Sequence, residues 1–130
     1  MSESLKSVGA ITMFVDDPKR SKKFYERVFG ASAIYEDENS VVFEFEKLIV
    51  NLLAERAAPE LIEPTPVAGR ETGERFQLTI WVEDADAVVE QLRSAGVALL
   101  NGPIDRPWGL RTAAFADPDG HVWEVAAKIG

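Results

Sequence analysis

The chain has 130 residues, 46% of them hydrophobic and 28% charged, and its formal net charge is −8, a balance typical of one folded domain spanning residues 1–130. It contains no cysteine and a single histidine, which excludes disulfides, thiolate nucleophiles and a histidine-rich metal site within one chain. Because phosphate contacts need clustered Lys and Arg, the acidic balance argues against a nucleic-acid partner and leaves a cationic or neutral ligand.

The first part of the chain, residues 8–54, predicts one strand, one helix and three further strands. Alternating apolar residues indicate a strand over 8–15. Asp17 is a suitable helix N-cap, Pro18 suits the first helical position, and Gly30 suits a left-handed helix stop. The three further strands are predicted over residues 33–36, 41–46 and 48–54.

The opening pattern of the chain occurs twice. Residues 11–17 match residues 78–84 in type at all seven positions. The second copy continues with an aspartate-capped helix and then with strands over 97–100, 111–116 and 121–127. Residues 55–75, rich in proline, glycine and charge, predict a linker. The sequence therefore predicts an α+β fold of two β-α-β-β-β units, 8–54 and 76–127, each too small to bury both faces of its sheet.

Residues 115–124 read Phe-Ala-Asp-Pro-Asp-Gly-His-Val-Trp-Glu, which predicts a tight turn between two strands. Together with the two strand–Asp–helix openings and the helix end Phe24-Tyr25…Gly30, this run resembles the vicinal oxygen chelate superfamily. That superfamily includes glyoxalase I, extradiol dioxygenases and the bleomycin- and fosfomycin-resistance proteins. The resemblance covers residues 8–127 and implies tandem units that curl mixed sheets around a cavity, often with units exchanged between two subunits.

The resemblance also implies where a metal would bind. In metal-using members, four ligands come from matching strand positions, which fall here on Ala10, Asn51, Gln77 and Glu124. Only Glu124 is a strong ligand, and Ala10 offers no donor. Because catalytic transition-metal sites generally use three side chains such as His or carboxylate, we expect no metal and no cofactor. The run Pro-Trp-Gly-Leu-Arg at 107–111 is similar to the bleomycin-resistance-like branch, which fits this expectation.

Strand alternation places Phe14 and Trp81 on the faces turned away from the helices. Core packing is the alternative interpretation of these two aromatic residues. A mostly apolar concavity with a few polar groups is typical of small-molecule sites, and flat rings suit an aromatic ligand. The predicted ligand-binding residues are Thr12, Phe14, Asn51, Gln77, Thr79, Trp81, Trp108, Arg111 and Glu124.

The simplest pairing of the last hairpin places Ala113 opposite Glu124, so that Arg111 would share the Glu124 face. The two charges would then either satisfy each other or hold a zwitterionic ligand. Trp108 either packs in a turn or lies at the mouth of a pocket. His121 is predicted to lie beside the hairpin turn without a ligand role.

These features favour a metal-independent protein that binds a small molecule, as antibiotic-resistance members of the superfamily do, and that forms a homodimer. The alternative is a glyoxalase- or dioxygenase-like enzyme, a lyase or an isomerase, in which Glu124 is the catalytic base. Residues 1–6 lack the apolar segment of a secretory signal, and no apolar run has the roughly 18 residues of a membrane span. We therefore expect a cytoplasmic protein without a membrane partner.

Overall fold

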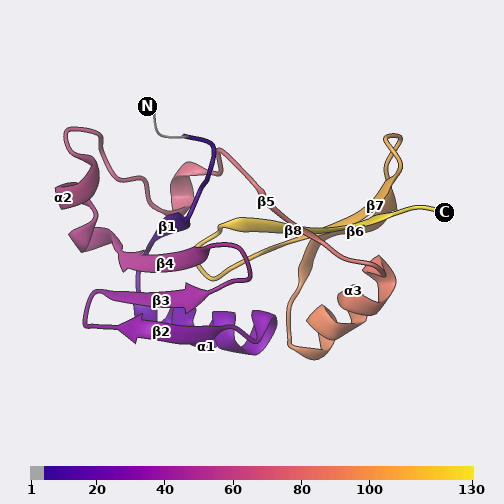
Figure 1. Cartoon of the computed structure of the whole chain (residues 1–130), viewed down its shortest axis with the longest axis horizontal. Helices are drawn as coiled ribbons and strands as arrows, with labels where there is room; N and C mark the ends of the chain where they lie inside the picture. Colours follow the sequence, from indigo (N-terminus) through magenta and orange to yellow (C-terminus); the bar gives the residue numbers. More distant parts are fainter. Residues whose placement is uncertain (1–4) are drawn as a thin grey trace. The chain divides into compact units, whose positions relative to one another are not determined.

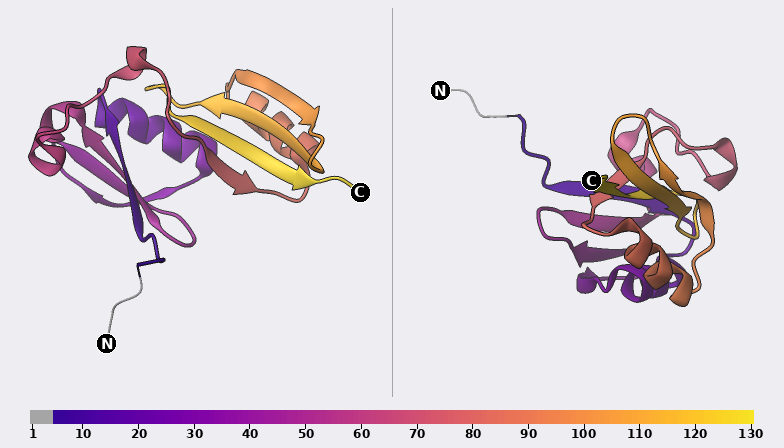
Figure 2. Two further views of the ribbon diagram at one scale, coloured as in Figure 1. Left: turned by 90° about the horizontal axis from the view of Figure 1, so that it is seen from above. Right: turned by 90° about the vertical axis from the view of Figure 1, so that its right-hand side faces the viewer.

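The computed structural model of the chain describes residues 5–130. The chain divides into two compact units between Gly69 and Arg70. Each unit has its own four-stranded mixed sheet and one longer helix, which lies against one face of that sheet (Figure 1 and Figure 2). The predicted α+β fold of tandem β-α-β-β-β units is confirmed. Within the described residues, no helix has the length and apolar character that crossing a membrane requires.

The first unit has the strand order β1-β4-β3-β2, in which only the β1–β4 pair is parallel. Its elements are β1 (Ala10–Val15), α1 (Pro18–Phe29), β2 (Ser32–Glu36), β3 (Ser40–Glu44) and β4 (Ile49–Ala54). The four strands agree with the predicted ones to within two residues at each end. The linker that follows contains three short helical turns, η1 (Glu55–Ala57), α2 (Pro59–Ile62) and η2 (Arg70–Thr72).

Helix α1 begins and ends as its sequence predicts. The Asp17 carboxylate accepts a hydrogen bond from the Lys19 amide at 3.0 Å, and Gly30 ends the helix at φ 63°. The buried side of the helix contacts the sheet through Tyr25, which stacks on Phe43 with ring centroids 5.8 Å apart. These local signals fix the helix boundaries because they satisfy backbone groups that the helix leaves unpaired at its ends.

The second unit repeats this arrangement with the strand order β5-β8-β7-β6, in which only β5–β8 is parallel. Its elements are β5 (Leu78–Trp81), α3 (Ala85–Ser94), β6 (Leu99–Asp105), β7 (Leu110–Ala116) and β8 (Val122–Lys128). Asp84 caps α3 by accepting from the Ala87 amide at 3.1 Å. Strand β6 extends five residues beyond its predicted end at residue 100.

The turn between β7 and β8 is organised by one buried carboxylate. Asp117 Oδ1 accepts from the amides of Asp119 and His121, each at 2.9 Å, and Asp117 Oδ2 lies 2.8 Å from His121 Nδ1. The His121 side chain is only 15% exposed. Burial by itself lowers the pKa of His121, but the hydrogen bond and the charge of Asp117, with Glu74 and Asp119, outweigh it and raise the pKa above 6.5.

This raised pKa predicts a pH-dependent stability. Protonated His121 stabilises the folded state, so its contribution is complete below pH 6.5 and is lost as the pH rises through the higher pKa of the folded protein. The free energy of unfolding should therefore exceed that of His121→Gln by an amount that shrinks as the pH rises. Urea denaturation of both proteins at a series of pH values measures this difference. A difference that stays constant with pH would contradict the prediction.

Candidate functional site

The second sheet has one face covered by α3 and an opposite face that carries three of the predicted site residues, Thr79, Trp81 and Glu124. In the β5–β8 pair, Thr79 lies beside Glu124 and Trp81 lies beside Ala126. Residues paired in this way project to the same side of a sheet. Thr79 Oγ1 donates a hydrogen bond to Glu124 Oε1 at 2.9 Å. The hydroxyl therefore holds the carboxylate in place while leaving acceptor positions on it for another donor.

Trp81 lies on this face with 70% of its surface exposed, which excludes the alternative of core packing for this residue. Its ring lines an open depression of about 360 Å³. The other lining residues are Val82, Glu83, Ala126 and Lys128. The exposed flat ring of Trp81, beside the buried Ala126, offers a stacking surface that is not part of the packed core.

The first unit carries the equivalent positions on its own sheet. Thr12 is paired with Asn51 and Phe14 with Leu53 in the parallel β1–β4 ladder, as Thr79 is with Glu124 in the second unit. Thr12 is exposed and Phe14 is half-buried. Asn51 Oδ1 is buried and has no hydrogen-bond partner among the described residues. An orphaned acceptor of this kind costs about 1–3 kcal/mol, and it is typical of places where a ligand or water supplies the donor.

The position of Arg111 corrects the sequence interpretation. Glu124 pairs with Ala114, one residue further along β7 than expected, and Arg111 pairs with Ala127. Arg111 therefore lies on the face covered by α3, where it donates to Asp86 at 2.9 Å and to Asp105 at 2.6 Å. These two hydrogen bonds raise the pKa of Arg111. The expectation that Arg111 shares the Glu124 face is wrong.

The physical reason is the length of the turn. The Asp117 amide donates to the His121 carbonyl at 2.9 Å, so three residues separate this closing pair, and Gly120 adopts φ 90°. A three-residue turn with a left-handed glycine shifts the ladder by one residue from the pairing that was expected. Because side chains alternate between faces, a shift of one residue places Ala113 and Arg111, the residues expected on the Glu124 face, on the opposite face of the sheet.

Two further predicted residues lie at the ends of strands. Gln77 is exposed and immediately precedes β5. Trp108 lies in the loop between β6 and β7, where it is 66% exposed and therefore not packed in the turn. Its ring centroid is 6.0 Å from the guanidinium carbon of Arg106, a residue that the sequence interpretation passed over in favour of Arg111.

The resemblance to metal-using proteins implies four ligand positions, and the side chains at these positions do not fit a catalytic metal ion. Ala10 has no donor, Asn51 and Gln77 offer neutral amides, and Glu124 offers one carboxylate that already accepts from Thr79. Across residues 5–130, no three His, Cys, Asp or Glu side chains come together as a metal site. Transition metals in enzymes generally need three stronger donors, so no chemical step is assigned to a metal here.

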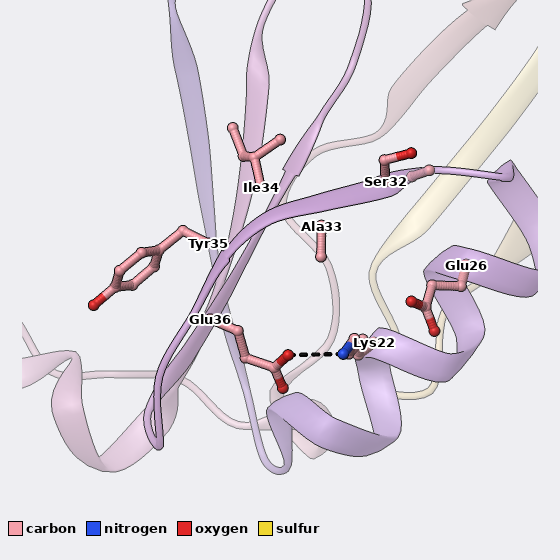
Figure 3. A pocket seen from close by; sticks show the side chains of 8 residues that line it. Lys22, Glu26, Ser32, Ala33, Ile34, Tyr35 and Glu36 are labelled. Atoms are coloured by element: carbon pink, nitrogen blue, oxygen red, sulfur yellow. Dashed lines mark hydrogen bonds and ion pairs between the residues drawn. The ribbon is translucent and has the colours of Figure 1, made fainter.

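The first unit has a separate hollow of about 600 Å³ between α1 and β2 (Figure 3). Lys22 Nζ and Glu36 Oε1 form an ion pair across it at 2.7 Å, and the hydrogen bond to Glu36 raises the pKa of Lys22. Because the lysine charge is already neutralised by its neighbour, this hollow offers a ligand less than the sheet face with Trp81 does.

Comparison with known proteins agrees with this architecture. Residues 7–125 match the family described as Glyoxalase/Bleomycin resistance protein/Dioxygenase superfamily. The chain is 25% identical over 124 residues to virulence protein STM3117 of Salmonella typhimurium, which covers 92% of this chain and 82% of that protein. It is 26% identical over 121 residues to metallothiol transferase FosB of Lysinibacillus sphaericus, covering 93% and 82%.

Solved structures show the same fold. A glyoxalase/bleomycin resistance protein/dioxygenase from Nocardioides superposes with a TM-score of 0.87 at 22% identity, covering 98% of this chain and 87% of that one. A glyoxalase-related enzyme from Fulvimarina pelagi gives a TM-score of 0.82 at 24% identity, covering 95% and 89%. The resemblance in the strand openings and in the turn at residues 115–124 is thereby confirmed. This chain belongs to the glyoxalase/bleomycin resistance protein/dioxygenase superfamily.

Proposed function

We propose that this protein binds a small aromatic or amphipathic molecule without using a metal ion. The observation that carries the proposal is the pairing of the exposed Trp81 ring with a carboxylate held by Thr79 on one sheet face. Stacking on the ring and a hydrogen bond to Glu124 are the two contacts expected of the ligand. The orphaned acceptor on Asn51 supports a similar role for the first unit. The proposed contact residues of the second unit are Gln77, Thr79, Trp81, Trp108 and Glu124, and those of the first unit are Thr12, Phe14 and Asn51.

The absence of a metal from this proposal rests on the donor chemistry of the chain. FosB of Lysinibacillus sphaericus is named a metallothiol transferase, and one fold hosts sites of different chemistry. Here Ala10 stands at one of the four positions that hold ligands in metal-using members. The remaining carboxylate and amides suit hydrogen bonding to an organic ligand better than they suit a transition metal.

We expect protein stripped of metal by EDTA to bind 2-naphthamide, an uncharged aromatic probe, with unchanged affinity. Trp81→Ala should weaken this binding about fivefold or more, because stacking on an aromatic ring contributes roughly 1 kcal/mol beyond area burial. Titrations of ¹⁵N-labelled protein followed through the tryptophan indole N–H signals measure both effects. Loss of binding after EDTA, restored by one metal ion per chain, would contradict the proposal.

An enzyme with Glu124 as its base is the second candidate. The observation in its favour is the Thr79 hydrogen bond, which fixes one carboxylate oxygen and leaves the other for a substrate proton. Binding without turnover separates the binding protein from this enzyme. In the enzyme, Glu124→Gln would abolish turnover while substrate still binds.

We also propose that the protein is a homodimer. Each sheet has two edge strands, and β2 exposes Ile34 and Tyr35 by 54% and 56%. Exposed edges and apolar side chains of this kind are commonly covered by a second copy of the chain. Light scattering at micromolar concentration should give twice the 14.3 kDa chain mass. A mass of one chain would count against the dimer.

A further inference from the structure

Two arginines of the second unit lie five residues apart in sequence and on opposite faces of the sheet. Arg111 faces α3 and is neutralised by Asp86 and Asp105. Arg106 instead donates from Nε to Thr112 Oγ1 at 3.0 Å and from Nη2 to Asn101 Oδ1 at 3.4 Å.

Strand register places these acceptors on the Glu124 face. Thr112 pairs with Ala126, and Ala114 pairs with Glu124, two residues further along each strand. On β6, Asn101 pairs with the same Ala114. Since alternate residues of a strand share a face, the side chain of Arg106 lies over the same face as Glu124, and its acceptors lie one and two strands away from β8.

The backbone of Arg106 is also fixed by hydrogen bonds. The Arg106 amide donates to the Leu110 carbonyl at 2.7 Å, and the Arg106 carbonyl accepts from Gly109 at 3.0 Å, which closes the turn between β6 and β7. The guanidinium is thus fixed from both ends before any ligand arrives. Such preorganisation reduces the side-chain entropy that binding would otherwise cost.

The partners of Arg106 are neutral, a hydroxyl and an amide. Across residues 5–130 it makes no ion pair with a carboxylate, whereas Arg111 makes two. Its acceptor Thr112 and the neighbouring Ala126 are buried, with 1% and 0% exposure, so the guanidinium borders a region that excludes water. A guanidinium that keeps its charge, has N–H groups to spare and borders a buried region is suited to bind an anion through its planar fork of donors.

We infer that Arg106 binds an anionic group of the ligand, so that the site takes an aromatic or amphipathic organic anion. The anionic group, a carboxylate or a phosphate ester, contacts Arg106. The aromatic body stacks on the exposed ring of Trp81, and a hydroxyl or amine at its other end reaches Glu124. This inference rests on the proposed function of the same sheet face. It also departs from the cationic or neutral ligand that the net charge of the chain suggests, because the local charge at Arg106 opposes the global one.

The test compares three probes on ¹⁵N-labelled protein: 2-naphthoate, 2-naphthyl phosphate and the uncharged 2-naphthamide. We expect at least one of the two anions to bind about tenfold or more tightly than the amide, as charge-assisted hydrogen bonds predict. Arg106→Gln should remove this preference and leave the affinity for 2-naphthamide unchanged. The matched control is Arg93→Gln, which removes the same charge from an exposed position on α3, where Arg93 pairs with Glu90 at 3.1 Å, and should keep the preference.

The outcomes separate the inference from the proposed function. If the anions and the amide bind equally and Trp81→Ala weakens all of them, the assignment of Arg106 is overturned and aromatic binding stands. If none of the three probes binds, both are overturned. The ratio of the two anion affinities tells a carboxylate site from a phosphate site. Arg106→Lys, which keeps the charge but loses the fork, is the second variant should Arg106→Gln fail to fold, and it should lose most of the preference.

Discussion

Alanine in place of Trp123 is expected to lower the free energy of unfolding by about 3–5 kcal/mol, whereas alanine in place of Trp81 is expected to change it by less than about 1 kcal/mol. The two tryptophans lie on adjacent strands of one sheet. Trp123 is 3% exposed on the face covered by α3, and Trp81 is 70% exposed on the other face. The same chemical change thus removes a packed core side chain in one variant and a free surface ring in the other.

Urea denaturation followed by circular dichroism measures both values, since the loss of a tryptophan would confound fluorescence. Trp123→Ala also serves as the positive control, because it shows how large the loss is when a tryptophan of this sheet is part of the core. A loss of several kcal/mol in Trp81→Ala would show that its ring is packed in the folded protein. The proposal that Trp81 stacks on a ligand would then be wrong.

The second large effect is expected at Gly102 in β6. Gly102 has φ 95°, and a Cβ added there would lie 2.5 Å from the Thr112 carbonyl oxygen and 2.6 Å from the Ala113 Cα atom. Both of these atoms belong to the backbone of β7 and cannot rotate away. Gly102→Ala should therefore combine about 1–2 kcal/mol of left-handed backbone strain with about 1–3 kcal/mol of steric strain, and it should separate β6 from β7.

Gly109 provides the matched control. Its φ is 88°, and a Cβ added there would meet nothing within 4 Å. Gly109→Ala should therefore lose only the backbone contribution of about 1–2 kcal/mol. Chemical denaturation of both variants gives the steric contribution as the difference between them. Equal losses in the two variants would mean that β6 approaches β7 less closely than the structure indicates.

The parts of the fold that sequence predicts well are those fixed by local chemistry. Asp17 and Gly30 delimit α1 because each satisfies backbone groups within its own turn, and the repeated opening at residues 78–84 locates β5 and the cap of α3. Strand β6 is longer than its sequence predicts, because it contains a bulge. Asn101 and Ile104, three residues apart, pair with Ala114 and Thr112, which are two apart. A bulge breaks the alternation on which a strand prediction depends.

The candidate site divides in the same way. Thr79, Trp81 and Glu124 could be assigned to one face from alternation within single strands, and the β5–β8 register agrees with that assignment. Arg111 could not be assigned to a face of the sheet. Its face depends on the register between β7 and β8, and that register depends on a turn whose length the sequence leaves open. A register shift of one residue places Arg111 on the face covered by α3. The face of Arg106 could not be predicted either, because the bulge in β6 interrupts the alternation just before the turn that contains Arg106.

The parallel pairing of β5 with β8 has a consequence for the order in which the second unit folds. Strands β6, β7 and β8 each pair with the strand next to them in sequence. The Thr79–Glu124 hydrogen bond between β5 and β8, by contrast, joins residues that are 45 positions apart. Closing a longer loop costs more chain entropy, so β5, a four-residue edge strand with one partner, is expected to dock last and to open first in amide hydrogen exchange. We therefore expect the strand that carries Thr79 and Trp81 to be the least protected of the sheet. A ligand that contacts Trp81 and Glu124 together ties β5 to β8, so that binding slows the exchange of its amides and completes the sheet.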